Sequence, residues 1–265
     1  MRLLDNVIWN ALTTRQANFA EAYGLACKFP AEVTSLGAFA EPTPEAYGSF
    51  AALLPIGGTV ALFLDESPRL PAELTLAREV PLLQMVYENG TALTAPPASM
   101  SSASRSSGSA PAARGGAASG DGPSPNSRSH MPAALPDLLE LTAVDAPEML
   151  ALAQLTKPGP FGPRTHELGT YLGIRREGKL AAMAGERLRV PGFTEVSAVC
   201  THPNHLGHGY ASALVTELVS RILRRGEIPF LHVRADNSRA IQIYRRLGFR
   251  DRHLFQLAVI RRSAK

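Results

Sequence analysis

The stretch from Glu195 to Arg225 constrains the fold most, because it joins a strand to a long helix through a glycine turn. Glu195 to Thr201 is rich in β-branched and small residues and is followed by Pro203, which predicts a buried strand. Beyond the turn, apolar residues recur at helical spacing, and Gly226 can close the helix with a left-handed cap. These apolar residues are Ala211, Leu214, Val215, Leu218, Ile222 and Leu223. A strand that feeds a helix in this way predicts an α/β fold.

The turn between the strand and the helix has the sequence LGHGYA, from Leu206 to Ala211, and predicts an anion site. The first N–H groups of a helix have no partners within the helix, and glycines allow a ligand to approach them closely. The helix dipole adds about half a positive charge at the same end. A phosphate or pyrophosphate is therefore one expected ligand, and a simple turning role for the glycines is the alternative.

Two common phosphate-binding motifs do not match this turn. The P-loop requires a Lys-Ser/Thr pair after its glycines, and the dinucleotide fingerprint requires a third glycine and a later acidic residue that binds ribose. The turn has neither feature, which argues against ATP and NAD as ligands.

Two motifs follow one another in the second half of the chain. The first is Val199-x-Thr201-x-Pro203 with Gly207-x-Gly209-Tyr210-Ala211, and the second is Asn237-x-x-Ala240-x-x-x-Tyr244-x-x-x-Gly248-Phe249. Together they resemble the GNAT superfamily of CoA-dependent N-acyltransferases, and its FR47-like branch in particular, from about Leu138 to the C-terminus. The chain has Asn204 and Leu206 where that family usually carries Gln or Arg. This departure weakens side-chain contacts to phosphate and leaves the backbone donors unchanged.

The resemblance implies a mixed open sheet flanked by helices, in which the strand before the turn splays away from the next parallel strand. It also implies acetyl-CoA as co-substrate, with its pantetheine arm in that gap and its pyrophosphate at the turn. The residues implied in CoA binding are Val199, Cys200, Thr201, Leu206, Gly207, His208, Gly209, Tyr210, Ala211 and Asn237. Asn237 can instead serve only as the N-cap of the last helix.

Acyl transfer from a thioester to an amine needs a neutral amine, a polarised carbonyl and a proton for the departing thiolate. Tyr244 matches the family tyrosine that protonates or hydrogen-bonds the CoA sulfur. The alternative is that Tyr244 is an ordinary aromatic residue of the core. Glu195 is the candidate general base, directly or through water, because several acetyltransferases place a glutamate near this point. The alternative is a solvated charge at the end of a strand. Glu186, on the preceding predicted strand, is the second candidate base.

Three histidines, His202, His205 and His208, recur at every third position and raise the alternative of a metal site. They straddle Pro203 and the turn rather than sharing one helix face, and no carboxylate motif accompanies them. We therefore expect no metal. No Ser-His-Asp or Cys-His pattern for nucleophilic catalysis is apparent either.

The segment between Pro96 and Ala134 contains no Leu, Ile, Val, Phe, Tyr or Trp and is built mainly from Ser, Ala, Gly and Pro. Such a segment cannot bury enough apolar surface to offset the entropy lost on ordering it. We therefore predict a disordered linker over 96–134, between an N-terminal α/β domain over 1–95 and an acetyltransferase domain over 135–265.

The first segment is expected to contain two helices followed by a three-stranded meander. One helix runs from Val7 to Ala22, and the other begins at the N-cap Thr43 and ends before Pro55. The strands are predicted at Thr59–Leu64, Glu73–Arg78 and Leu82–Tyr87. This order resembles the front part of an acetyltransferase domain, so we interpret the segment as a smaller, degenerate copy of that fold. It has no glycine turn, which argues against a second CoA site.

The second segment is expected to alternate strands and helices. Besides the strand and helix around the glycine turn, strands are predicted at Leu138–Thr142, Tyr171–Arg175, Leu180–Leu188, Phe230–Val233 and Phe255–Ile260, with helices at about 145–155 and at Ser238–Leu247.

Charge and composition narrow the class of protein. Residues 1–134 carry 8 Lys and Arg against 11 Asp and Glu, whereas residues 135–265 carry 19 against 12. The basic second segment suits a polyanion such as CoA, but its arginines are scattered and lack an accompanying aromatic row, so no nucleic-acid partner is expected. No apolar run is long enough to span a membrane, and Cys27 and Cys200 do not suggest a disulfide framework. We therefore expect a cytoplasmic protein with no membrane partner.

The sequence thus predicts an acetyl-CoA-dependent N-acetyltransferase that transfers acetyl directly to the amine of a small molecule or a peptide. A catalytically silent acyl-CoA-binding or regulatory module is the alternative. The acceptor stays open because its pocket is built from loops, and the oligomeric state stays open as well.

Overall fold

The computed structural model describes residues 2–88 and 137–264, so the predicted linker over 96–134 lies outside the described residues. The helices in these ranges are α1 (Val7–Leu12), α2 (Pro44–Leu53), α3 (Ala146–Thr156), α4 (Tyr210–Arg224) and α5 (Ser238–Arg246). The strands are β1 (Glu21–Tyr23), β2 (Ala26–Lys28), β3 (Gly37–Phe39), β4 (Thr59–Leu64), β5 (Leu74–Tyr87), β6 (Leu139–Leu141), β7 (Tyr171–Arg176), β8 (Lys179–Val190), β9 (Phe193–Thr201), β10 (Ile228–Arg234) and β11 (Phe249–Arg262). Every element predicted for the second segment is therefore present.

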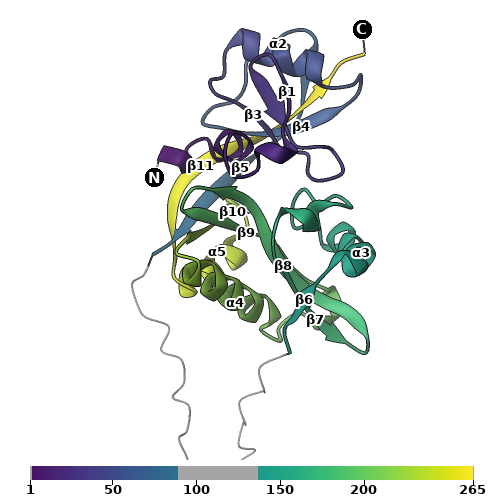
Figure 1. Ribbon diagram of the computed structural model, residues 1–265, viewed down its shortest axis with the longest axis vertical. Helices are drawn as coiled ribbons and strands as arrows, with labels where there is room; N and C mark the ends of the chain where they lie inside the picture. The colour runs from purple at the N-terminus through teal and green to yellow at the C-terminus, as the bar shows by residue number, and fades with distance from the viewer. Residues whose placement is uncertain (1, 89–136, 265) are drawn as a thin grey trace, which may run out of the picture. The chain divides into compact units, whose positions relative to one another are not determined.

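Eight strands of the described chain form one open sheet in the order β4-β11-β5-β10-β9-β8-β7-β6 (Figure 1). Neighbouring strands run antiparallel except β9 and β10, which run parallel. The first segment also forms a smaller antiparallel sheet from β1, β2 and β3. The predicted α/β architecture, a mixed open sheet with flanking helices and a smaller N-terminal part, is confirmed.

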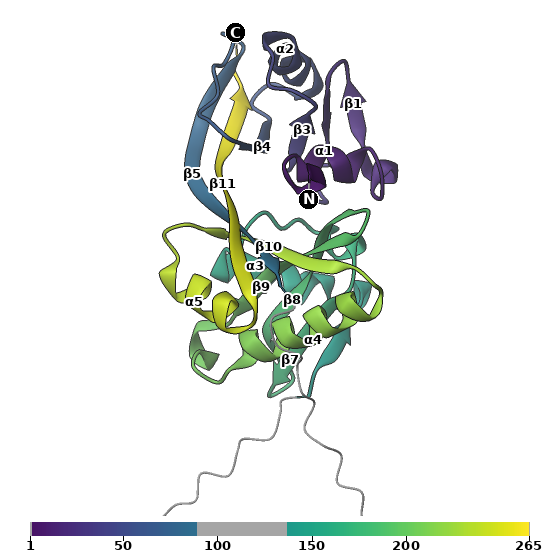
Figure 2. The same ribbon diagram turned by 90° about the vertical axis from the view of Figure 1, so that its left-hand side faces the viewer.

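Strand β5 connects the two segments of the chain, because it lies between β11 and β10 in the large sheet (Figure 2). Two strands are predicted here on either side of Pro81, but the structure has a single strand, Leu74–Tyr87. The proline is tolerated because β10 pairs with β5 only from Leu82 to Val86, so Pro81 lies where β5 leaves that neighbour. Residues 2–88 and 137–264 belong to one compact unit. The division at residue 95, drawn from composition, therefore does not coincide with a division of the sheet.

The helices of the second segment cover both faces of the sheet (Figure 1). On one face, α4 packs Leu214 and Leu218 into a core with Ile241 of α5. On the other face, α3 packs Met149 against Met183 of β8. The two cores lie on opposite faces because successive side chains along each strand point to opposite sides of the sheet. None of the helices in residues 2–88 and 137–264 is long and apolar enough to cross a membrane.

Helix α1 is shorter than the sequence predicts, because the expected helix over 7–22 ends at Leu12. Gln16 is buried instead and binds the backbone of β8. Its side-chain amide donates to the carbonyl of Arg187 at 2.7 Å and accepts from the N–H of Arg189 at 3.1 Å. A long-range contact with the sheet therefore replaces the end of the predicted helix.

Candidate functional site

Strands β9 and β10 separate in the middle of the sheet and leave a gap. Their parallel pairing joins only Phe193–Glu195 to Ile228–Phe230, so Ser197–Thr201 has no β10 partner among the described residues. Ala198 has a φ of 53°, and the register between β8 and β9 shifts at the same place. Such an irregularity bends a strand and leaves backbone groups unpaired. The gap that the sequence resemblance implies is therefore present, with Val199–Thr201 along its edge.

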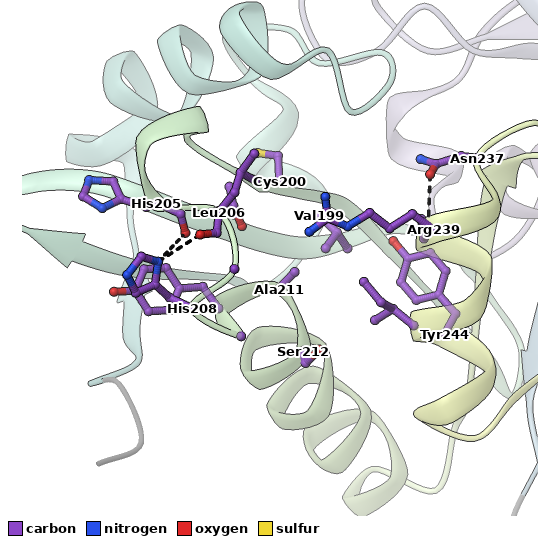
Figure 3. A pocket seen from close by; sticks show the side chains of 16 residues that line it. Val199, Cys200, His205, Leu206, His208, Ala211, Ser212, Asn237, Arg239 and Tyr244 are labelled. Carbon is purple, nitrogen blue, oxygen red and sulfur yellow. Dashed lines mark hydrogen bonds between the residues drawn. The ribbon is translucent and has the colours of Figure 1, made fainter. Parts of the chain in front are cut away.

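A cavity of about 300 Å³ lies at the glycine turn, where β9 leads into α4 (Figure 3). Gly207 and Gly209 have φ values of 84° and 76°, which glycine adopts without strain. A Cβ atom added to either glycine would meet open space, so the missing side chains leave room for a ligand. Helix α4 starts at Tyr210 without a side-chain cap, which leaves its first N–H groups available.

All the residues predicted to bind CoA line this one cavity. They are joined there by His205, Ser212, Arg239, Ala240, Ile243 and Tyr244. Asn237 has a second role, because its side chain accepts from the N–H of Ala240 at 3.1 Å and caps α5. The predicted capping role of Asn237 is thus present together with a place on the cavity wall.

Two arginines that no sequence motif indicates add positive charge around the turn. Arg176 of β7 donates from Nε to the Tyr210 hydroxyl at 2.6 Å, and its guanidinium lies 4.9 Å from the centre of that ring. Arg239 of α5 forms no ion pair within the described chain, and Figure 3 shows its side chain extending toward Val199. Both come from elements other than the turn, so the spacing of residues around the glycines could not reveal them.

Tyr244 extends from α5 toward β9, with its hydroxyl directed away from the helix (Figure 3). The hydroxyl makes no hydrogen bond with another described residue. The Tyr244 ring packs against Phe249, with 6.0 Å between the two ring centres. Burial, helped by the nearby Cys200, raises the pKa of Tyr244 to about 12. The phenol is therefore protonated at neutral pH and can act as a proton donor.

A second cavity, of about 570 Å³, adjoins the first. The two share Val199, Cys200, Thr201, Asn237, Ala240 and Tyr244. Most of the remaining walls of the second cavity come from β4, β5, the loop after α3, β8, an earlier part of β9, β10 and β11. These elements are far apart in the sequence, so no local pattern predicts this cavity.

Glu195 is completely buried and lines neither cavity. Its carboxylate accepts from Nε and Nη2 of Arg187 at 2.9 and 2.7 Å. Burial alone would raise the pKa of Glu195, but the charge and hydrogen bonds of Arg187, helped by His232, lower it to about 2. The prediction of Glu195 as general base does not fit this placement, because a carboxylate paired in this way is a weak base and cannot reach the substrate. The alternative of a solvated charge is wrong as well.

Glu186 does not fit the role of base either. It is 1% exposed and accepts from Nη2 of Arg225 at 2.7 Å. It faces Gly169, where a Cβ atom would lie 2.9 Å from its Oε2. Neither predicted carboxylate borders the two cavities, and each forms an ion pair with an arginine instead.

His232 completes the network around Glu195 and is a wall residue that the sequence does not indicate. Its Nδ1 lies 2.7 Å from Glu195, and its Nε2 lies 3.0 Å from the side-chain nitrogen of Gln84. Arg252 donates to the oxygen of Gln84 at 2.7 Å, so the Gln84 nitrogen is the donor to His232. The imidazole proton then lies on Nδ1, where it is donated to Glu195. Burial lowers the pKa of His232, which keeps the ring neutral.

The remaining candidate groups have local roles. Burial raises the pKa of the Cys200 thiol to about 11, so this cavity residue is a poor nucleophile. Nδ1 of His202 accepts from the N–H of Asn204 at 3.2 Å, and Nδ1 of His208 lies 3.1 Å from the carbonyl of His205. Within residues 2–88 and 137–264, no group of three or more His, Cys, Asp or Glu side chains could hold a metal ion.

Comparisons with known proteins identify relatives of this chain. Residues 171–256 match the family model of FR47-like proteins. The N-alpha-acetyltransferase RimI of Mycobacterium tuberculosis is 37% identical over 120 residues, which cover 41% of this chain and 75% of that protein. A crystal structure from Novosphingobium aromaticivorans, described as a GNAT-family acetyltransferase, is 31% identical, with a TM-score of 0.76 over 98% of this chain and 99% of its own. A GCN5-related N-acetyltransferase from Kribbella flavida shares the fold, with a TM-score of 0.54 and 16% identity over 100% of this chain and 95% of its own.

Proposed function

Since the chain belongs to the GNAT family of acetyltransferases, we propose that it transfers an acetyl group from acetyl-CoA directly to an amine. The observation that carries this proposal is the pair of adjoining cavities, which meet at Tyr244 and at the part of β9 that has no β10 partner. One cavity offers a helix N-terminus suited to a pyrophosphate, and the other has room for a second substrate. The protonated Cys200 thiol favours direct transfer over a covalent acyl-enzyme.

The residues of the first cavity have distinct roles in this proposal. Backbone N–H groups from Gly207 to Ser212 hold the pyrophosphate, with Arg239 supplying charge nearby. The backbone edge of Val199–Thr201 that faces away from β8 holds the pantetheine arm and polarises the acetyl carbonyl. As the carbon–sulfur bond breaks, Tyr244 donates its proton to the departing thiolate.

No carboxylate lines the second cavity within the described chain, and the basic Nε2 of His232 already accepts from Gln84, so the proposal includes no side-chain base. The amine reaches the cavity in its neutral form and attacks the carbonyl, and water accepts the proton that it loses. The rate is then expected to rise with pH until the amine is fully neutral. The relative RimI is by name an N-alpha-acetyltransferase, so α-amines are the first acceptors to test. The cytoplasmic location stays a prediction from the sequence.

A valine at position 209 tests the role of the glycine turn. Gly209→Val places a branched side chain in the space beside the free N–H groups of α4, at a positive φ. Acetyl-CoA binding in calorimetry should be lost while the far-ultraviolet circular dichroism is unchanged. Gly178→Val is the matched control, because Gly178 has the same φ of 76° and equally open surroundings but lies in the β7–β8 turn.

Unchanged acetyl-CoA affinity in the folded Gly209→Val protein would contradict the proposal. For the wild-type protein, thiol release in the presence of a broad panel of amines, followed by mass spectrometry, tests transfer itself. Acetyl-CoA binding without acetylation of any amine would favour the catalytically silent module instead.

A further inference from the structure

We propose that the acceptor amine carries a carboxylate and that Arg187 binds this carboxylate in the second cavity. The inference rests on the proposed acetyl transfer and names the class of acceptor: a small amino acid or a similar amino acid-like molecule, rather than a polyamine or a lysine-rich peptide.

The geometry of Arg187 carries this inference. Its side chain lies on the wall of the 570 Å³ cavity and is only 7% exposed. Nε and Nη2 both donate to Glu195, whereas Nη1 donates to no other described residue. A Cβ atom placed on Gly159 would lie 3.9 Å from Nη1. Nη1 therefore points to the loop that closes the cavity, and the glycine leaves space in front of it.

Nη1 is not sealed inside the protein without a partner, because it opens to the cavity, where a ligand can reach it. A charged donor that is free of protein partners in a largely buried site can give a strong hydrogen bond to a ligand. A carboxylate is the natural partner of a guanidinium, since hydrogen bonds between ionised groups are short and strong. Glu195 already holds the other edge of the guanidinium rigidly, so Arg187 can orient a bound anion with little loss of side-chain entropy.

The charges around the cavity favour the same kind of ligand. Its wall includes Arg78, Lys157 and Arg234 besides Arg187, and none of its described wall residues is an aspartate or glutamate. Arg78 and Lys157 form no ion pair within the described chain, and Arg234 pairs only with the exposed Asp236. Glu195 neutralises Arg187 and Asp236 neutralises Arg234, so Arg78 and Lys157 supply the long-range attraction. Such a field attracts anions and disfavours acceptors with several positive charges.

The size and position of the cavity suit a small molecule bound at two points. A volume of about 570 Å³ lies within the usual range for small-molecule sites. Arg187 and Tyr244 both lie on its wall, so a molecule held at Arg187 by its carboxylate can present its amine to the site of transfer.

Matched acceptors test the inference on the wild-type protein. Each pair consists of an amino acid and its amide, such as glycine with glycinamide and alanine with alaninamide, with spermidine and a lysine-rich peptide as cationic acceptors. Values of kcat/KM are measured across pH and expressed per neutral amine, because the amide lowers the pKa of its own amine. We expect each amino acid to exceed its amide by about tenfold or more, as is typical of a hydrogen bond between charged groups.

Arg187→Lys provides the second test. A lysine can keep the ion pair with Glu195 but has no equivalent of Nη1, so folding is expected to survive. The KM for the amino acid should rise about tenfold or more, while kcat for the amide and the KM for acetyl-CoA stay close to wild type. Arg261→Lys, on the exposed end of β11, is the control and should change none of these values.

The outcomes separate this inference from the proposed function. Acetylation of amides or cationic peptides as efficiently as amino acids would overturn the inference and leave the acetyltransferase proposal intact. If Arg187→Lys lowered kcat/KM equally for an amino acid and for its amide, this result would also overturn the inference and leave the acetyltransferase proposal intact. Failure to acetylate any amine, with acetyl-CoA still bound, would overturn the proposed function. If Arg187→Lys does not fold, the wild-type comparison decides alone.

Discussion

The two adjoining cavities are built in different ways. The cavity at the glycine turn uses mainly one continuous stretch, residues 199–212, with a contribution from α5. The second cavity shares part of β9 and α5 with the first and adds walls from β4, β5, the loop after α3, β8, β10 and β11. A short motif can therefore specify the first cavity, whereas the second exists only after β5 has paired between β10 and β11. Under the proposed function, the recognition of acetyl-CoA is local and the recognition of the acceptor depends on long-range pairing.

The largest expected effect comes from separating the two segments of the chain. A fragment of residues 136–265 lacks β5 and leaves β10 and β11 without the strand that pairs with both. Exposed strand edges and a half-covered core should prevent cooperative unfolding and acetyl-CoA binding in this fragment. Adding a fragment of residues 1–90 should restore both, as measured by circular dichroism and calorimetry. A fragment of 136–265 that unfolds cooperatively and binds acetyl-CoA alone would instead support two independent domains.

Glu195→Gln should produce the next largest effect, because it leaves Arg187 as an uncompensated buried charge. Breaking a buried ion pair by removing one partner typically costs about 3–5 kcal/mol of unfolding free energy. Glu140→Gln is the control, since Glu140 pairs with Arg221 at the surface, where the loss should stay below about 1 kcal/mol. Urea unfolding at pH 7 measures both. If Glu195→Gln and Glu140→Gln lost the same unfolding free energy, the Glu195 pair would not support the second cavity.

The same carboxylate predicts a pH dependence of stability. The pKa of Glu195 is lowered from 4.5 to about 2 in the folded protein, so the unfolded chain binds this proton more tightly. Its contribution to stability is complete above pH 4.5 and is lost as the pH falls from 4.5 toward 2. The Glu195→Gln protein should lose less stability over this interval than the wild type.

Tyr244 lies on the wall that the two cavities share. Tyr244→Phe should have the smallest effect of these changes, because we expect it to alter turnover alone. The substitution removes the proton donor with little change in volume, so turnover should fall about a hundredfold while acetyl-CoA affinity stays unchanged. Tyr87→Phe is the matched control, because Tyr87 packs 5.5 Å from the same Phe249 but lines neither cavity. Wild-type turnover in Tyr244→Phe, measured where chemistry limits the rate, would leave solvent as the proton donor.

Several features could be predicted from the sequence because they depend on neighbours along the chain. The strand before Pro203, the turn with Gly207 and Gly209, and α4 with its apolar stripe are determined by local propensity and periodicity. The Thr43 cap of α2 is of the same kind, since its side chain accepts from Ala46. The residues around the turn, and Tyr244 on the next helix, were named through the resemblance to the GNAT superfamily, which rests on two such local motifs.

Other features were decided only by the tertiary structure. A carboxylate at position 195 can serve as a base, a surface charge or half of an ion pair, and the approach of Arg187 and His232 selects the last. Likewise, helical periodicity continues past Leu12, but the contact of Gln16 with β8 ends the helix. The sequence by itself determined the glycine turn, because its donors belong to consecutive backbone groups. The tertiary structure decided the second cavity and its charge, because both arise where strands distant in the sequence meet and exclude water.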